Sequence, residues 1–477
     1  MPPIGINRYL PLGALAVVLV GGCQQYVDKP LQPSQTATQL LNRSLSSPEL
    51  RDFLKQNLGH DLPDWPLKNW DFETLNWAAF YYNPSLSIAR EQWAMAHGGI
   101  ITAGERPNPT LTAGPGYDFN PAAGTISPWL PAVTLDVPVE TAGKRAKRME
   151  QMTWLAESAR LNVFTAAWQV RSDLRQALIE WDAAGRRATV ARNQVALARH
   201  ILDLLQQRLD AGAIAADEMS ATRIIWVKAQ SDAGAAERAL GMARARIAEV
   251  IGVPSSAIDG VEFSVAQLTQ GKTFTPADIA AARATSLQMR ADVLAAMAIY
   301  EASQSALKLE IAKQYPDIHL GSGYQYDLGE NKWSLSIGVD LPVFNHNEGP
   351  IAEAAAAREQ AAGQVLAVQA HIIAQIDAAA AAYAAATGLV EDMGKVNTEL
   401  QKHLDLINAQ IAAGATDELD RMNAQLDAEV SQQALVDAQL QVATARGQLE
   451  DAFQIPLANL SAVQIDPLQA TSSSTKP

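Results

Sequence analysis

The chain has 477 residues, a formal net charge of -14 at pH 7 and a sequence pI of about 5.0. This acidic balance argues against binding to nucleic acid, because contact with phosphates needs a basic face. Hydrophobic residues make up 48% of the chain but aromatic residues only 6%. Much of the apolar share is alanine, a strong helix former whose small side chain lets helices pack closely. The composition favours an elongated helical protein.

The first residues are typical of an export signal. Arg8 precedes an apolar run over residues 10–20, which is too short to span a bilayer. The order Gly21-Gly22-Cys23 resembles a bacterial lipobox, so we predict a signal peptide over residues 1–22 and lipid attachment at Cys23. Gln24 resembles the outer-membrane sorting pattern. The alternative is a plain secretory signal with a chance cysteine, and Cys23 is the only cysteine in the chain.

Most of the remaining chain is an internal duplication, in which equivalent residues of the two copies lie slightly more than 200 positions apart. Residues 109–117 match 316–324, 135–139 match 339–343, 211–213 match 413–415, and 253–254 match 455–456. We therefore predict five parts: the signal peptide, an N-terminal periplasmic segment, two structural repeats and a C-terminal tail. After the signal peptide, their boundaries are 23–73, 74–275, 276–457 and 458–477.

We expect the first repeat to begin with a helix, and each repeat contains two segments in which apolar and polar side chains alternate. The apolar positions are Leu111, Ala113, Tyr117 and Phe119; Val133, Leu135, Val137 and Val139; Ile318, Leu320, Tyr324 and Tyr326; Trp333, Leu335, Ile337, Val339 and Leu341. A length of about ten residues suits a tilted transmembrane strand, and aromatic residues near the distal ends are typical of a barrel girdle. The alternative is a small soluble sheet that buries its apolar face on helices.

Each repeat then continues as a long helical hairpin, because no proline occurs between Pro138 and Pro254 or between Pro350 and Pro456. The run over residues 143–211 would extend roughly 100 Å as a helix. Gly212 and Gly414 permit left-handed turns at the hairpin tips. The second run carries a coiled-coil seam with one polar member, Asn397. The seam is Val365, Val368, Ile372, Ile376, Ala379, Tyr383, Ala386, Val390, Met393, Asn397, Leu400, Leu404, Ile407 and Ile411.

These elements predict a mainly α-helical fold with a membrane β-barrel contribution. Long antiparallel coiled-coil hairpins and four transmembrane strands per chain would be internally duplicated. Four strands cannot close a barrel, and lipid does not tolerate open sheet edges, so copies of the chain must share a barrel. Two copies would supply eight strands and three would supply twelve. The interior of an eight-stranded barrel is filled by side chains, so a conduit favours a trimeric α/β barrel.

The residues resemble the TolC-like outer-membrane efflux protein family over about residues 74–457. The resemblance rests on the duplicated order and on the stretches 83–84, 106–111 and 341–344 together with the two glycine tips. It implies a homotrimer in the outer membrane, continued by a helical tunnel through the periplasm. Its partners would be a periplasmic adaptor (membrane fusion) protein, an inner-membrane pump and outer-membrane lipid. Residues 24–70 and 255–276 would form a less regular belt around the tunnel.

A narrower resemblance, to the heavy-metal cation efflux branch, is visible at residues 140–145, which are followed by Lys147 and Arg148. The alternative is that these cations sit at the lipid headgroups of the inner leaflet, where basic residues are favourable.

The acids around the tips are candidates for a cation-admitting entrance ring: Asp203, Asp210, Asp217, Asp405, Asp417 and Asp420. The alternative is that carboxylates such as Asp417 only favour helix starts. The tip residues Gly212, Ala213, Gly414 and Ala415 are the candidate adaptor-docking positions. We expect no catalytic site, bound metal or cofactor, since the seven histidines are scattered. A protein-secretion duct with the same architecture and a structural coiled-coil lipoprotein remain as alternative functions.

Overall fold

The computed structural model describes residues 25–124, 126–269, 273–327 and 329–455, and for residues 216–218 the backbone alone. The chain divides into two units, Met1–Arg43 and Ser44–Pro477. The first unit contains one described helix, α2 (Pro33–Leu41), whose residues are all exposed. The predicted signal peptide, Cys23 and the predicted tail after residue 457 lie outside the described residues.

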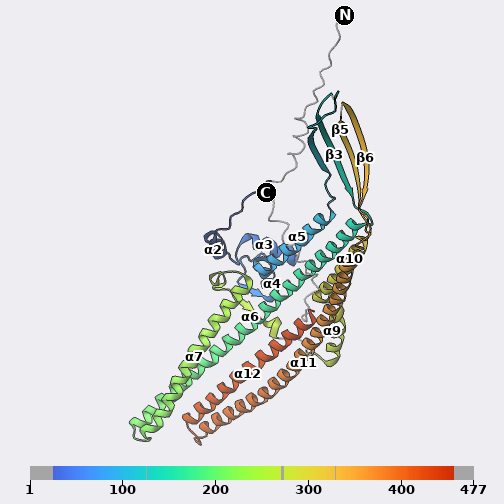
Figure 1. The fold of residues 1–477 in the computed structure, drawn as a ribbon. Coiled ribbons are helices and arrows are strands. Elements are labelled where there is room, and N and C mark those ends of the chain that lie inside the picture. Colours follow the sequence, from blue (N-terminus) through green and yellow to red (C-terminus); the bar gives the residue numbers. More distant parts are fainter. Residues whose placement is uncertain (1–24, 125, 270–272, 328, 456–477) are drawn as a thin grey trace. The chain divides into compact units, whose positions relative to one another are not determined.

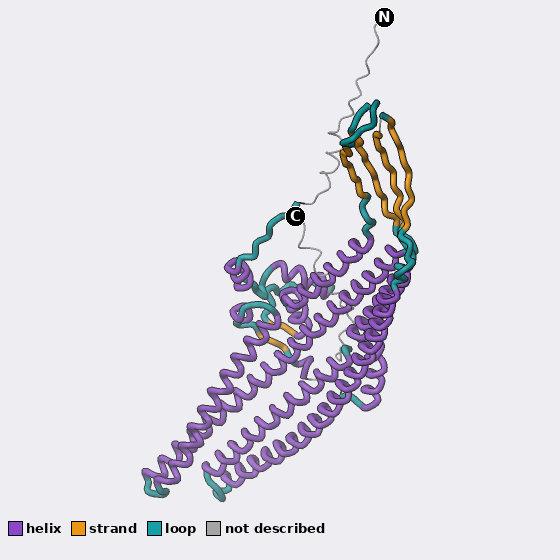
Figure 2. Tube along the Cα trace, viewed as in Figure 1, coloured by secondary structure: helices purple, strands orange, loops and turns teal. Residues whose placement is uncertain are grey.

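The second unit repeats the same series of elements, as the duplicated sequence predicts (Figures 1 and 2). The first series is α4 (Phe72–Tyr82), α5 (Pro84–Gly104), β2 (Thr110–Tyr117), β3 (Trp129–Val139), α6 (Lys144–Asp210) and α7 (Ala216–Ile251). The second is α9 (Pro276–Met289), α10 (Ala291–Ala312), β5 (Ile318–Asp327), β6 (Glu330–Val339), α11 (Glu348–Ala412) and α12 (Glu418–Phe453). The prediction of a mainly helical fold with long antiparallel hairpins is confirmed.

The long helices pack lengthwise. Helix α6 has 67 residues and contacts α5, α7, α10 and α12, while α11 pairs with α12 and α10. Every residue of the predicted seam on α11 is buried or half-buried, and the positions beside the seam are mostly exposed. Asn397 lies in this seam, and its side-chain oxygen is buried without a hydrogen-bond partner. Apolar spacing of three and four residues therefore located the face that α11 presents to its neighbours.

The four amphipathic strands form one antiparallel sheet in the order β2-β3-β5-β6. Its register gathers the apolar side chains on one face, where Leu111, Leu135 and Leu335 lie in one row and Val137, Leu320 and Ile337 in another. At the distal end Tyr117 packs on Trp129 and Tyr324 on Trp333, each pair with ring centroids 5.0 Å apart.

The apolar face of this sheet is exposed in the single chain. Trp333 is 80% exposed, Leu335 90% and Ile337 75%. The alternative of a soluble sheet that buries this face on helices is therefore wrong, because the helices pack on one another and leave the sheet uncovered (Figure 2). Strands β2 and β6 are the two open edges.

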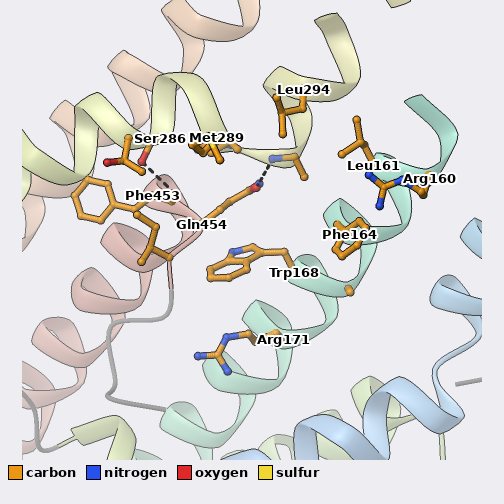
Figure 3. A pocket seen from close by; sticks show the side chains of 15 residues that line it. Arg160, Leu161, Phe164, Trp168, Arg171, Ser286, Met289, Leu294, Phe453 and Gln454 are labelled. Carbon is orange, nitrogen blue, oxygen red and sulfur yellow. Dashed lines mark hydrogen bonds between the residues drawn. The ribbon is translucent and has the colours of Figure 1, made fainter. Parts of the chain in front are cut away.

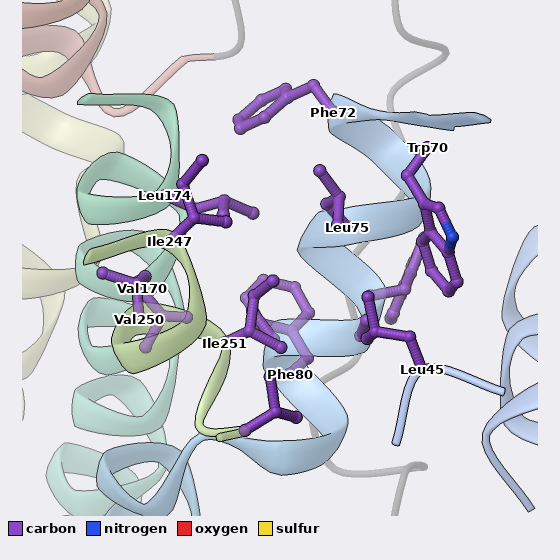
Figure 4. Packing of buried hydrophobic residues seen from close by; sticks show 14 of the residues in the cluster. Leu45, Trp70, Phe72, Leu75, Phe80, Val170, Leu174, Ile247, Val250 and Ile251 are labelled. Atoms are coloured by element: carbon purple, nitrogen blue, oxygen red, sulfur yellow. The ribbon is translucent and has the colours of Figure 1, made fainter. Parts of the chain in front are cut away.

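The two segments predicted to form an irregular belt contain short helices, and a pair of short strands connects one segment to the other. They contain α3 (Pro48–Leu58), η1 (Ser255–Ile258) and α8 (Ala266–Thr269). Strand β1 (Asn69–Asp71) pairs in parallel with β4 (Glu262–Ser264), which places Trp70 beside Phe263. The largest buried cluster lies next to this pair. In it α4 packs against α6 and α7 through Leu75, Phe80, Val170, Leu174, Ile247 and Ile251 (Figure 4).

Candidate functional site: the hairpin tips and the strand-to-helix junction

The two hairpin tips have the same turn. Gly212 and Gly414 adopt φ angles of +69° and +70°. The amide of Ala213 donates to the carbonyl of Arg208 over 2.8 Å, and the amide of Ala415 donates to the carbonyl of Gln410 over 2.8 Å. This is the hydrogen-bond pattern of a Schellman motif. A Cβ atom on either glycine would meet nothing within 4 Å, so each tip is an open turn that requires glycine for its backbone conformation alone.

The tips of one chain are linked to each other. Arg208 Nη2, in the last turn of α6, lies 2.7 Å from Asp417 Oδ2 at the start of α12. Next to this ion pair, apolar side chains from both hairpins form one cluster that includes Leu205, Met219 and Met422. The first hairpin is thus held to the second where both turn.

The candidate entrance acids have separate surroundings. Asp203 pairs with Arg199 at 3.2 Å, Asp210 accepts from Gln206 at 2.8 Å, and Asp420 accepts from Thr416. Asp405 is exposed, and the side chain of Asp217 lies outside the described residues. Within the described part of the chain, no three acidic or histidine side chains gather to hold a metal ion. A ring of these acids stays a prediction about the assembled protein.

Asp417 has a helix-capping role that the sequence suggested. Its carboxylate accepts from the amides of Leu419 at 2.9 Å and Asp420 at 3.2 Å. The hydrogen bond from Arg208 is the main cause that lowers the pKa of Asp417 below 3.8, while desolvation opposes it. A carboxyl with a lowered folded-state pKa stabilises the fold above its unfolded pKa, and this stability is lost as pH falls through the folded value. The link between the tips is therefore complete at neutral pH and weakens only below about pH 4.

Replacing Asp417 by asparagine is expected to keep the cap and lose the ion pair, since asparagine caps helices about as well as aspartate. Replacement by alanine loses both and should destabilise the first turn of α12 by about 0.5–2 kcal/mol. Amide hydrogen exchange at Leu419 and Asp420 should then be faster in Asp417→Ala but close to wild type in Asp417→Asn. Equal protection in all three proteins would contradict the capping role.

The basic residues after β3 are bound within the protein. Lys144 Nζ lies 2.8 Å from Asp317 Oδ1, and the same oxygen accepts from the Thr141 amide at 2.9 Å. Arg148 forms a two-pronged ion pair with Glu140, with contacts of 2.6 and 3.2 Å. Lys144 and Arg148 are therefore held by ion pairs within the chain, and a position at the lipid headgroups stays a prediction. The Lys144 side chain is only 9% exposed, and its charge joins the β3–α6 connection to the start of β5.

The electrostatics of this junction follow from its contacts. Desolvation by itself would raise the pKa of Asp317, but the hydrogen bonds from Lys144 and from the Thr141 amide outweigh it and lower that pKa. Arg148 and Arg145 also donate to the carbonyls of Ala103 and Gly104 in the last turn of α5. Cations are favourable at a helix C-terminus. The junction thus fixes the sheet to two helices, a role that the spacing of charges in the sequence did not reveal.

The sequence also missed a cavity of about 330 Å³ between α6, α9, α10 and the end of α12. Phe164, Trp168, Met289 and Phe453 line it (Figure 3). Two of its polar side chains are already hydrogen-bonded. Ser286 Oγ contacts the carbonyl of Phe453 at 3.1 Å, and Gln454 accepts from the Ala291 amide at 3.3 Å. The lining comes from four separate elements, so no local sequence pattern marks it.

Comparison with known proteins places the chain in one protein family. A sequence profile described as outer membrane efflux protein matches residues 81–253 and 283–453. The cobalt-zinc-cadmium resistance protein CzcC of Cupriavidus metallidurans is 23% identical over 287 residues, which cover 60% of this chain. The match spans 66% of that relative, just under two thirds of its length.

Solved structures share the fold. A membrane protein from Pseudomonas aeruginosa superposes with a TM-score of 0.66 at 19% identity and covers 80% of this chain and 93% of that chain. The outer membrane protein VceC from Vibrio cholerae gives 0.65 at 18% identity, with 80% and 95% covered. The CmeC outer membrane channel of Campylobacter jejuni gives 0.67 at 12% identity, with 91% and 93% covered.

Proposed function

The chain belongs to the outer membrane efflux protein family, and we propose that it is the outer-membrane channel subunit of a tripartite efflux system that passes small solutes to the exterior. The observation that carries this proposal is the four-stranded sheet, which has one exposed apolar face and two unpaired edges. A sheet of this kind suits lipid on its apolar side and water on its polar side.

Assembly follows from the two edges. Strand β6 of one copy pairs with β2 of the next, because unpaired backbone groups are costly in lipid. Three copies supply twelve strands, enough for an open lumen, whereas two supply the eight of a filled barrel. We therefore propose a homotrimer whose barrel lies in the outer membrane. We also propose the two structural repeats with boundaries 74–275 and 276–457.

The helices support the same assembly. Helix α11 contains an 18-residue window with mean hydropathy 1.5, of which 17% is buried in the single chain, so by length and composition alone it could cross a membrane. Apolar side chains also lie outside its seam, among them Leu366, Ile373, Leu389, Val396 and Leu406. In the proposed trimer these positions face neighbouring copies, and the hairpins together form the wall of a periplasmic tunnel.

The partners are also part of the proposal. The turns at Gly212, Ala213, Gly414 and Ala415 form the surface for a periplasmic adaptor, and an inner-membrane pump completes the system. Divalent metal cations are the first substrate class to test, because one relative is named for resistance to cobalt, zinc and cadmium.

Mass and conductance of the detergent-purified protein test the assembly. We expect native mass spectrometry to give three times the protomer mass and planar bilayers to show stepwise conductance of single channels. A protein that stays monomeric in detergent and never conducts would overturn the proposed function.

Lipid attachment is proposed at Cys23 on the strength of the lipobox, and this residue lies outside the described part of the chain. Cells labelled with a fatty-acid analogue should incorporate label into the wild type and none into Cys23→Ser. Persistent label on the variant would remove Cys23 as the anchor.

A further inference from the structure

We propose that His319 and Asp136 form a weak binding station for divalent transition-metal cations on the polar face of the sheet, at the end next to the helices. This inference rests on the proposed channel function, because the polar face lines the lumen only in the closed barrel. It deepens that function by naming a substrate class and the residues that contact it.

The two side chains meet across neighbouring strands. Asp136 lies on β3 and His319 on β5, and His319 Nδ1 is 2.9 Å from Asp136 Oδ2. With Nδ1 donating to the carboxylate, the lone pair of Nε2 is left for a ligand. Histidines that bind metal usually donate their other ring N–H to a carboxylate or carbonyl, which fixes the ring and makes the free nitrogen a better ligand.

The surroundings leave this pair open. In the register, Asp136 lies opposite Gly321 on β5, and His319 lies opposite Gly338 on β6. Neither glycine has a side chain that could cover the pair, and the side chains of His319 and Asp136 are 42% and 43% exposed. Nearby side chains of the same face are small and polar, namely Ser336 in the row of Asp136 and Thr134 and Ser334 in the next row.

The local charge favours a cation. Asp317 directly precedes β5 and Asp340 directly follows β6, and the pairing of Ile318 with Val339 brings both acids to the end of the sheet that carries His319. Asp317 is paired with Lys144, whereas Asp340 has no ion pair among the described residues. An imidazole with carboxylates nearby suits zinc or cobalt, while magnesium and calcium prefer oxygen ligands alone.

The station must be weak. The described residues contain no group of three or more metal-binding side chains, so each copy offers one imidazole and adjacent carboxylates. A conducting pathway needs sites that attract an ion and also release it. Three copies would place three such stations around the lumen, next to the helical tunnel from which the ions arrive.

The test measures potassium conductance of the reconstituted trimer while zinc chloride is titrated. Zinc should lower the wild-type conductance saturably and reversibly, and magnesium at equal concentration should not. His319→Gln keeps a donor for Asp136 and should raise the zinc midpoint at least about tenfold. Asp136→Asn removes the carboxylate that orients the ring and should raise it by about 10- to 100-fold. His371→Gln, which changes an exposed histidine on α11, is the matched control and should keep the wild-type midpoint.

The outcomes separate the two proposals. A wild-type protein that neither conducts nor shows the mass of a trimer would overturn the channel function and this inference with it. A conducting wild-type trimer that responds equally to zinc and magnesium would overturn the metal station alone, even if the variants fail to assemble. An unchanged zinc midpoint in His319→Gln would do the same.

Discussion

Substituting arginine for Leu335 is expected to remove the assembled channel from the outer membrane, while the same substitution at the adjacent Ser336 leaves it in place. Leu335 is 90% exposed on the apolar face of β6, which we propose contacts lipid. Arginine on the lipid face of a β-barrel costs about 2–4 kcal/mol near the bilayer midplane, and a trimer would carry it three times.

Ser336 provides a control within the same strand. Its side chain belongs to the polar face, in the row that contains Asp136 and Gly321. Lumenal water and the Asp136 carboxylate can solvate an arginine there. The amount of trimer in isolated outer membranes, measured by native mass spectrometry of the detergent extract, compares the two variants. Equal amounts of both would place the apolar face away from lipid.

Changing Gly212 or Gly414 to valine is expected to abolish efflux in cells without loss of insertion or conductance. Both glycines have left-handed φ angles near +70°, a conformation that costs an ordinary L-residue about 1–2 kcal/mol. No neighbouring atom would clash with the new side chain, so the change acts through the shape of the turn and the bulk it presents to an adaptor.

A helical glycine with equally open surroundings gives the control. Gly241 lies within α7, and a Cβ there also meets nothing within 4 Å, so Gly241→Val should retain efflux. Crosslinks from Ala213→Cys and Ala415→Cys to the adaptor provide a direct measurement. If neither position crosslinks in cells whose pump is active, the tips do not form the docking surface.

Much of the architecture could be predicted because it is encoded in residues close together in the chain. The period of two in β6 and the spacing of three and four in α11 identify which side chains share a face. Proline-free runs set the helix lengths, and a glycine at each tip permits the turn. Both halves of the sequence show the same series of patterns, and each half therefore supported the order of elements predicted for the other.

The candidate site was harder to predict because charge alone does not show what a side chain contacts. Six acids near the tips looked alike in sequence, yet Asp417 caps a helix and pairs with Arg208, while Asp203 pairs with Arg199 within its own helix. Lys144 looked like a surface cation and is instead buried against Asp317. In each case the partner's position depends on how separate helices and strands pack.

The sequence by itself determined the helical hairpins, the four amphipathic strands and their repetition, because these depend on local periodicity and backbone preference. Only the tertiary structure decided which distant side chains meet. Arg208 and Asp417 are 209 residues apart, and Asp136 and His319 are 183 apart. Such pairs form because the packing of α6 on α12 and the register of β3 on β5 bring them within hydrogen-bond distance, and no pattern within either segment carries that information.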